Sequence, residues 1–152
     1  MIHINEIIPK GCVLIRNTAS DKKAVIRQLI GLLDTQGCVV NKEMLYQDVI
    51  ERENLTSTGI GNGCGIPHAH SDAVTHTVLA VACLNPAISF DSIDEIPVRI
   101  VFLLAGPKSC TGMHLKILSK MARLLHGQDY CNALAQAESE DSFREILKIR
   151  DD

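Results

Sequence analysis

The residues best suited to chemistry lie between Ser57 and His68, where four glycines and a proline precede the histidine. Glycine lets the backbone approach a ligand closely and adopt conformations that other residues avoid, and proline stiffens the segment. We therefore expect the His68 ring to be held on a fixed platform, open to an incoming group, as a nucleophilic histidine must be. The alternative is an ordinary glycine-rich strand and turn that happens to end in a histidine.

Three further polar residues suit an anion bound beside His68. His114 lies at the expected start of a helix, where free backbone N–H groups and a partial positive charge favour an anion such as phosphate. Arg52 and Thr58 flank the glycine-rich segment, and guanidinium and hydroxyl groups suit phosphate oxygens. The alternative for His114 is a residue that faces solvent at the start of a helix.

A metal site is the competing interpretation of the same region. His68 and His70 would share one face of a strand, with Cys64 and His76 close in sequence. Nothing nearby supplies a convincing third and fourth ligand, and the glycines around Cys64 are typical of open access rather than of a closed ligand shell. We therefore expect no metal and no cofactor. A metal-dependent hydrolase is the alternative, and bound zinc would reveal it.

The composition excludes other classes of function. A formal net charge of -3 provides no basic field for a phosphate backbone, and 3% aromatic residues provide few stacking platforms, so we expect no nucleic-acid binding. The first residues lack the pattern of a signal peptide. The longest apolar runs, such as 100–105, are too short to span a bilayer. We expect a cytoplasmic protein without direct membrane insertion.

The chain has six cysteines and no CxxC pair, which gives no support to a zinc ribbon or a thioredoxin motif. Three disulfides are one alternative. Because several of these cysteines lie in apolar, strand-like runs, we instead expect buried free thiols in a reducing compartment. Cys64, close to His68, is either an inert buried thiol or a group open to oxidation.

The elements that must position these residues alternate between strands and helices. Apolar runs predict strands over 12–16, 77–84 and 98–105, with Pro86 ending the second. Helical spacing predicts one helix capped by Ser20 and ended before Gly37, and another capped by Asn41 and ending near 52–53. Three more helices are predicted over 113–125, 131–137 and 142–149.

The helix over 113–125 is predicted to be amphipathic, with an apolar stripe formed by Leu115, Leu118, Ala122 and Leu125. The chain shows no internal repeat, no low-complexity tract and no linker. The simplest organisation is one α/β domain over residues 1–152.

The motifs of this chain resemble those of the enzyme IIA domains of the fructose/mannitol class in the bacterial phosphoenolpyruvate-dependent phosphotransferase system. The resemblance rests on Arg52-Glu53, on the run Ser-Thr-Gly-Ile-Gly-Asn-Gly over 57–63, and on Ile66-Pro67-His68. The segments 88–91, 98–104 and 114–119 fit the same family in the expected order. The unbroken run over 57–63 is closest to the nitrogen-regulatory (PtsN-type) members. Gly65 departs from the pattern, since the family usually has alanine there.

The resemblance implies a phosphoryl carrier with a central mixed β-sheet flanked by helices on both faces. His68 matches the histidine that accepts a phosphoryl group from HPr or a close relative, and family analogy favours its Nε2 atom. His114 matches a second histidine that donates a hydrogen bond to a phosphoryl oxygen. Arg52 matches an arginine that compensates charge, and Thr58 would add a hydroxyl donor.

Two functions stay open within this resemblance. A regulatory protein would change its binding to target proteins with its phosphorylation state, whereas a sugar-uptake carrier would pass the group to a permease component. The 57–63 run favours regulation. A neighbouring permease gene would favour uptake, and a neighbouring sigma factor or kinase gene would favour regulation. In either case we expect exposed apolar residues and carboxylates around His68, where a partner protein must dock.

Overall fold

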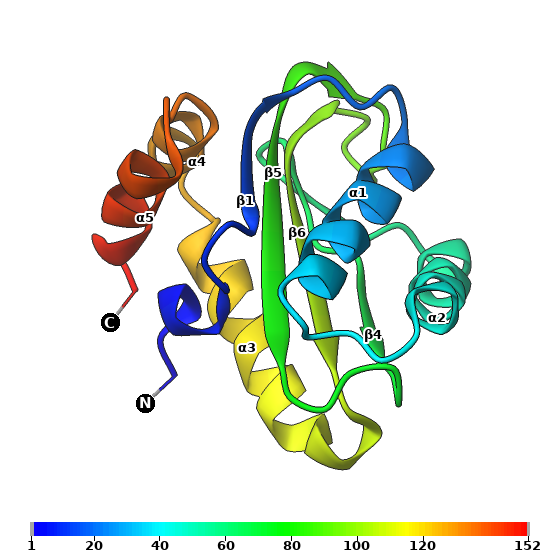
Figure 1. The fold of residues 1–152 in the computed structure, drawn as a ribbon. Helices are drawn as coiled ribbons and strands as arrows, with labels where there is room; N and C mark the ends of the chain where they lie inside the picture. Colours follow the sequence, from blue (N-terminus) through cyan, green and yellow to red (C-terminus); the bar gives the residue numbers. More distant parts are fainter. Residues whose placement is uncertain (1, 152) are drawn as a thin grey trace.

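Six strands form one mixed sheet at the centre of the computed structural model, which describes residues 2–151 (Figure 1). The order is β1-β5-β6-β3-β2, and β4 also pairs with β6. β5 and β6 are antiparallel, whereas β1 runs parallel to β5, and β3 and β4 run parallel to β6. The strands are β1 (Val13–Asn17), β2 (Gly59–Gly61), β3 (Cys64–Gly65), β4 (His68–His70), β5 (Val78–Ile88) and β6 (Val98–Gly106).

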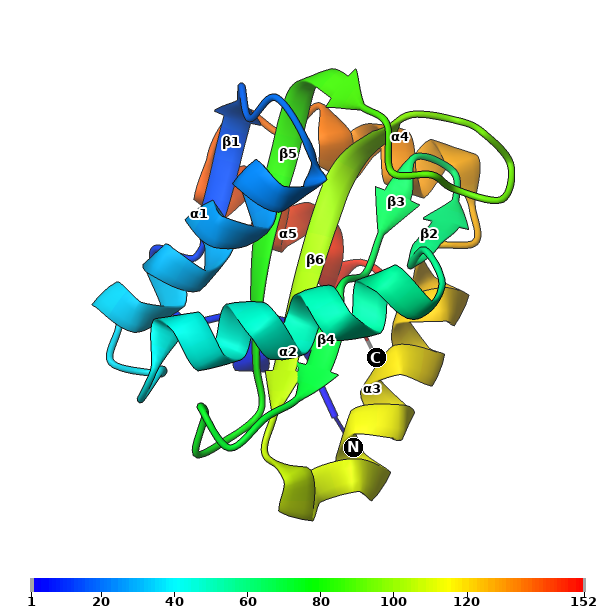
Figure 2. The same cartoon turned by 90° about the vertical axis from the view of Figure 1, so that its right-hand side faces the viewer.

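Helices cover both faces of this sheet, as predicted. On one face lie α1 (Lys22–Thr35) and α2 (Lys42–Leu55), and on the other lie α4 (Gln128–Ala135) and α5 (Glu140–Lys148) (Figures 1 and 2). α3 (Thr111–Leu124) precedes α4 and runs beside the ends of β4 and β6 (Figure 2). Short 3-10 turns, η1 (Ile4–Ile7) and η2 (Lys108–Cys110), precede β1 and α3.

The two central strands form the core. β5 is buried from Val78 to Leu84 and β6 is buried at nearly every residue, because helices cover both sides of them. The apolar runs therefore located both strands. The prediction that Pro86 ends the strand over 77–84 was wrong: β5 continues to Ile88 through an exposed, irregular stretch, and proline is tolerated at such a bulge.

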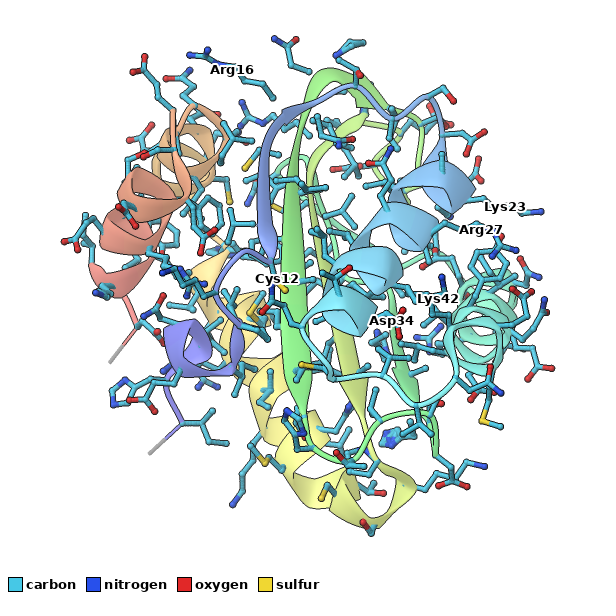
Figure 3. All side chains as sticks on the ribbon, viewed as in Figure 1. Cys12, Arg16, Lys23, Arg27, Asp34 and Lys42 are labelled. Carbon is cyan, nitrogen blue, oxygen red and sulfur yellow. The ribbon has the colours of Figure 1, made fainter. Side chains whose placement is uncertain are left out.

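α1 shows how the helices divide between core and solvent. Val25, Leu29 and Leu33 are buried against the sheet, whereas Lys23, Arg27 and Asp34 project from the outer side of the helix (Figure 3). The Arg27 guanidinium lies 3.1 Å from the Glu43 carboxylate and so joins α1 to α2. Such an exposed pair stabilises the fold little.

The N-cap of α2 is Asn41, as predicted from the sequence, whereas the N-cap of α1 differs from the prediction. The Asn41 side chain accepts a hydrogen bond from the Met44 backbone N–H at 3.0 Å. The α1 cap is Asp21 rather than Ser20, and its carboxylate accepts from the Ala24 N–H at 2.8 Å. Two adjacent residues were both good caps, and the helix begins after the second of them.

The predicted apolar stripe of α3 was only partly right, because Leu125 is buried and Leu118 packs against the core but the other two members do not. Leu115 and Ala122 are exposed, and the buried side of the helix carries Ile117, Met121 and Leu124 together with His114. The buried face of α3 differs from the predicted one because His114, a polar residue, occupies a buried position in its first turn. A pattern built from apolar residues alone therefore pointed to the neighbouring face of the helix. Leu115 is thereby left available at the surface beside His114.

The last two helices begin earlier than predicted. α4 starts at Gln128, and α5 starts at Glu140, after a capping box in which Ser139 and Ser142 bond each other's backbone N–H groups. A serine at the third helical position replaces the usual Glu or Gln of this motif, which hid the start. Within residues 2–151, no helix combines the length and apolar character needed to cross a membrane.

Candidate functional site

The glycine-rich segment folds as a hairpin, β2 and β3, that leads into β4. Its turn passes through Gly61, Asn62 and Gly63, all with positive φ (95°, 57° and 75°); glycine adopts such values without strain, and asparagine tolerates them better than most residues. At Gly65 an added Cβ would lie 2.8 Å from the Phe90 ring. The Phe90 ring thus explains the glycine where alanine was expected. These glycines shape the hairpin that carries His68, so they position its ring from a distance.

β4 presents two histidines to the same side. It pairs with β6 so that His68 lies beside Leu104 and His70 beside Gly106, with Ala69 buried between them. This is the alternation expected of a strand. His68 and His70 are both partly buried.

The geometry of His68 fixes its tautomer. Its Nδ1 lies 2.7 Å from the backbone carbonyl oxygen of Ile66. Because a carbonyl oxygen only accepts hydrogen bonds, Nδ1 carries the proton, and Nε2 keeps its lone pair. Burial lowers the pKa of His68, which keeps the ring neutral near pH 7. Nε2 is therefore a neutral ring nitrogen with a free lone pair in a defined orientation.

His114 lies beside both of these rings. It stands in the first turn of α3, and its ring centroid is 5.5 Å from that of His68 and 4.1 Å from that of His70. Its side chain is buried, so the alternative of a solvent-facing residue was wrong. Burial, together with the neighbouring His70 and His68, lowers the pKa of His114 to about 4. His114 is thus neutral at physiological pH.

A cavity of about 650 Å³ opens at these rings. Arg52 at the end of α2 lines it, and the Arg52 guanidinium donates to the Thr56 carbonyl at 3.2 Å. Lys108 lines it from η2, a second cation that the sequence analysis missed. The only available signal was a basic residue just before the helix of His114. The lining residues are Asp48, Glu51, Arg52, Leu55, His68, Ala69, His70, Lys108, His114, Leu115 and Leu118.

Thr58 is buried and does not line this cavity. Its hydroxyl and its backbone N–H both donate to the carboxylate of Glu53, which also accepts from Lys22 Nζ at 2.9 Å. The expected hydroxyl donation to a phosphate group is therefore not available in this structure. Instead, the hydrogen bonds from Thr58 to Glu53 link the residue before β2 to the last turns of α2, next to Arg52.

The sequence was compared with models of known protein families, and this comparison shows the family of the chain. The family described as "Phosphoenolpyruvate-dependent sugar phosphotransferase system, EIIA 2" matches residues 6–149. The chain belongs to this family. It is an enzyme IIA-type phosphoryl carrier of the phosphotransferase system, in agreement with the resemblance noted from its motifs.

Relatives of this enzyme IIA chain carry two kinds of name. The fructose-specific EIIA component of Haloferax volcanii is 32% identical over 144 residues, which cover 95% of this chain and 94% of the relative. The nitrogen regulatory protein of Pseudomonas aeruginosa is 29% identical, covering 97% and 96%. A third relative, the fructose-specific EIIABC component of Bacillus subtilis, is 29% identical, but the chain spans only 23% of its length.

Solved structures give the same picture. The nitrogen regulatory protein IIA-Ntr of Neisseria meningitidis superposes with a TM-score of 0.88 at 29% identity, covering 95% of this chain and 98% of that one. The mannitol IIA of Escherichia coli superposes with a TM-score of 0.79 at 22% identity, covering 92% and 98%, which supports the fold alone.

The metal site considered from the sequence needs a set of ligand side chains close together in the described residues. In residues 2–151, no group of three or more His, Cys, Asp or Glu side chains is placed to hold a metal ion. The cysteines are free, and five of the six are buried, as expected. Cys64 lies against Cys131, with 3.6 Å between the sulfur atoms. The hydrogen bond to Cys131, followed by burial, raises the pKa of the Cys64 thiol, so the inert-thiol interpretation is favoured.

Removing the Thr58 hydroxyl is predicted to lower the stability of the fold more than the rate of phosphoryl transfer. Thr58→Val leaves Glu53 with one hydrogen bond fewer in a buried network, so the free energy of unfolding should fall by about 1–2 kcal/mol. Transfer by the folded enzyme IIA should fall less than about tenfold, since only the position of Arg52 is loosened. Urea unfolding and phosphoryl uptake measure the two effects. A hundredfold slower uptake at unchanged stability would restore Thr58 as a direct donor.

The buried His114 is predicted to weaken the fold at acid pH. In the unfolded chain a histidine takes up a proton near pH 6.5, whereas folded His114 does so only near pH 4. Between these values the unfolded state binds more protons, so stability falls as the pH falls. From pH 7 to pH 5 this group should cost about 2 kcal/mol. Urea unfolding of the wild type and of His114→Gln at both pH values tests this, because the variant should lose correspondingly less stability.

Proposed function

We propose that this enzyme IIA accepts a phosphoryl group on Nε2 of His68 from a phosphohistidine donor of the HPr type. The observation that carries the proposal is the hydrogen bond from His68 Nδ1 to the Ile66 carbonyl, which leaves Nε2 as the nucleophile at the cavity. In the transfer, the Nε2 lone pair forms the new N–P bond as the N–P bond to the donor histidine breaks. The electron pair of the broken bond stays on the donor nitrogen, and no proton leaves His68, because its proton remains on Nδ1 in the hydrogen bond to the Ile66 carbonyl oxygen.

The surroundings of His68 suit the charge that arrives with the phosphoryl group. Its three outer oxygens carry negative charge through the transfer, and catalysis consists mainly of positioning and of compensating that charge. Arg52 and Lys108 bring two cations to the cavity wall, and His114 brings a neutral ring that offers an N–H group. In the present structure Lys108 Nζ lies 3.7 Å from Asp72, at an exposed and therefore weak pair, so little holds it away from an anion.

The rim of the cavity suits a docking protein. Leu55 is 80% exposed and Leu115 is 59% exposed, and both line the cavity. Asp48 and Glu51 add carboxylates from α2 on the same side. A small apolar centre with an acidic edge favours a donor with an apolar patch and basic residues around its histidine.

We further propose that this chain is regulatory, so that its phosphorylation state alters binding to a target protein. Two relatives named for nitrogen regulation support this, because they match nearly end to end, and one superposes with a TM-score of 0.88. The fructose-specific EIIA of Haloferax volcanii, at 32% identity, keeps sugar uptake as the alternative. Buried free thiols are typical of a reducing compartment, so we place the protein in the cytoplasm.

Phosphoryl transfer in vitro tests the proposal. The wild type and His76→Ala, which loses an exposed histidine outside the cavity, are incubated with phosphoenolpyruvate, enzyme I and HPr and followed by intact mass. Both should gain one phosphoryl group. No gain with HPr or with its nitrogen-branch relative would overturn the carrier proposal. The phosphorylated chain is then mixed with a purified fructose-type IIB component: rapid transfer would contradict the regulatory assignment and support uptake.

A further inference from the structure

Three residues form a row across the ends of β4, β6 and β5, directly beneath the His114 ring. Gly106 is the middle residue. On one side β4 places His70 beside it, and on the other side the pairing of Val78 with Ala105 places Thr77 next to it. A Cβ added at Gly106 would lie 3.2 Å from Nδ1 of His114 and 3.2 Å from Oγ1 of Thr77. Glycine at this position thus lets the imidazole and the hydroxyl approach the same point.

Both of these polar side chains lack a hydrogen-bond partner. Nδ1 and Nε2 of His114 and Oγ1 of Thr77 are buried, and none makes a hydrogen bond with the part of the chain that the structure describes. Thr77 is 7% exposed and His114 is 1% exposed. Buried polar groups are nearly always paired, because an unpaired one costs its full desolvation energy. Two such side chains beside one glycine call for a joint explanation.

We propose that Thr77 is a positioning residue whose hydroxyl donates a hydrogen bond to Nδ1 of His114. Each of the two atoms lies 3.2 Å from the same point, the place of a Cβ at Gly106, and no hydrogen bond joins them in this structure; the proposal requires a rotation of the Thr77 side chain or a small shift of α3 to form it. His70 does not compete, because its ring packs against the His114 ring at 4.1 Å with the planes tilted by 40°. A hydroxyl that donates to Nδ1 requires the proton of the neutral ring to be on Nε2.

This tautomer matters for transfer, and here the inference rests on the proposed function. A phosphoryl oxygen only accepts hydrogen bonds, so His114 helps only when the nitrogen that faces it carries a proton. Nδ1 lies toward Gly106, so Nε2, which is also buried, is the nitrogen left to donate to a group bound beside His68. The opposite tautomer would direct a lone pair at an anion. Thr77 therefore selects the form of His114 that stabilises the transferred group.

Nitrogen NMR of the His114 ring tests the inference separately from phosphoryl transfer. In ¹⁵N-histidine-labelled wild type, the ring shifts should show a proton on Nε2 and not on Nδ1. Thr77→Val keeps the shape of the side chain without the hydroxyl and should give a mixture of both tautomers. Thr77→Ser should restore the wild-type pattern. Thr77→Ala is a second variant without the hydroxyl, for use if the valine variant does not fold.

Transfer rates give the second readout. Phosphoryl uptake at His68 should be about tenfold slower in Thr77→Val and within about twofold of the wild type in Thr77→Ser, as the loss and return of one hydrogen bond predict. An unchanged His114 tautomer in Thr77→Val, or a serine variant as slow as the valine variant, would overturn the inference. Failure of the wild type to be phosphorylated would instead overturn the proposed function, and the tautomer measurement does not depend on it.

Discussion

His68→Ala is expected to abolish phosphoryl uptake. The variant removes the single nitrogen that combines a lone pair, a fixed orientation and a place at the cavity, because Nδ1 of the same ring is engaged with Ile66. Neither neighbouring imidazole replaces it, since His114 is buried and His70 is packed against His114. Intact mass after incubation with phosphoenolpyruvate, enzyme I and HPr should show no added phosphoryl group.

His70→Ala is the matched control for this experiment. It removes the other imidazole from the same side of β4 and leaves His68 and its hydrogen bond in place. This control should still gain one phosphoryl group. A His68→Ala protein that gains one as well would move the acceptor to another residue and contradict the account of the site.

His114→Ala is expected to slow phosphoryl uptake by about a hundredfold while leaving the acceptor intact. The buried ring lies 5.5 Å from His68, and loss of one donor placed at developing negative charge typically costs about a hundredfold to a thousandfold in rate. Single-turnover transfer from phosphorylated HPr measures this effect. The final mass of the variant should equal that of the phosphorylated wild type, because His68 still accepts.

His114→Gln separates the hydrogen bond from the packing. A glutamine side chain carries an N–H group at about the distance of Nε2 from the backbone, so this variant should be faster than His114→Ala. A His114→Ala protein that transfers at the wild-type rate would remove His114 from the mechanism. Equal slowing by both variants would assign its contribution to shape.

The sequence predicted those parts of the fold that depend on neighbours along the chain. β5 and β6 are long apolar runs because both faces of the sheet are covered, and this pattern is visible without a structure. The glycines over 57–68 likewise predicted a platform that holds His68, although the hairpin with its turn at 61–63 was not itself predicted. The spacing of His68 and His70 suggested a strand that presents both rings on one face, and β4 does so.

The face of α3 could not be predicted in the same way. A search for apolar spacing leaves out a buried histidine because the residue is polar. The predicted apolar stripe of α3 therefore began at Leu115, one position after His114, where the buried face begins. The tertiary structure reverses the assignment: His114 is buried, and Leu115 lies exposed at the rim of the cavity. Functional positions are where such local rules fail, because they favour chemistry over packing.

Contacts between distant segments were also invisible to the sequence. Thr58 is a reasonable phosphate ligand by type, and only the path of the chain from α2 into β2 shows that Glu53 takes its hydroxyl. Lys108 reaches the cavity because β6 ends beside β4. Thr77 meets His114 only through the register of β5 on β6 and the missing side chain of Gly106.

The attachment atom is the most direct test of the account. The ¹⁵N-histidine-labelled protein is phosphorylated by phosphoenolpyruvate, enzyme I and HPr, and its ring nitrogens are recorded for coupling to ³¹P. The hydrogen bond from His68 Nδ1 to Ile66 predicts coupling at Nε2 of His68, with the proton still on Nδ1. Coupling at Nδ1 of His68, or at any other histidine, would contradict the tautomer and with it the proposed site.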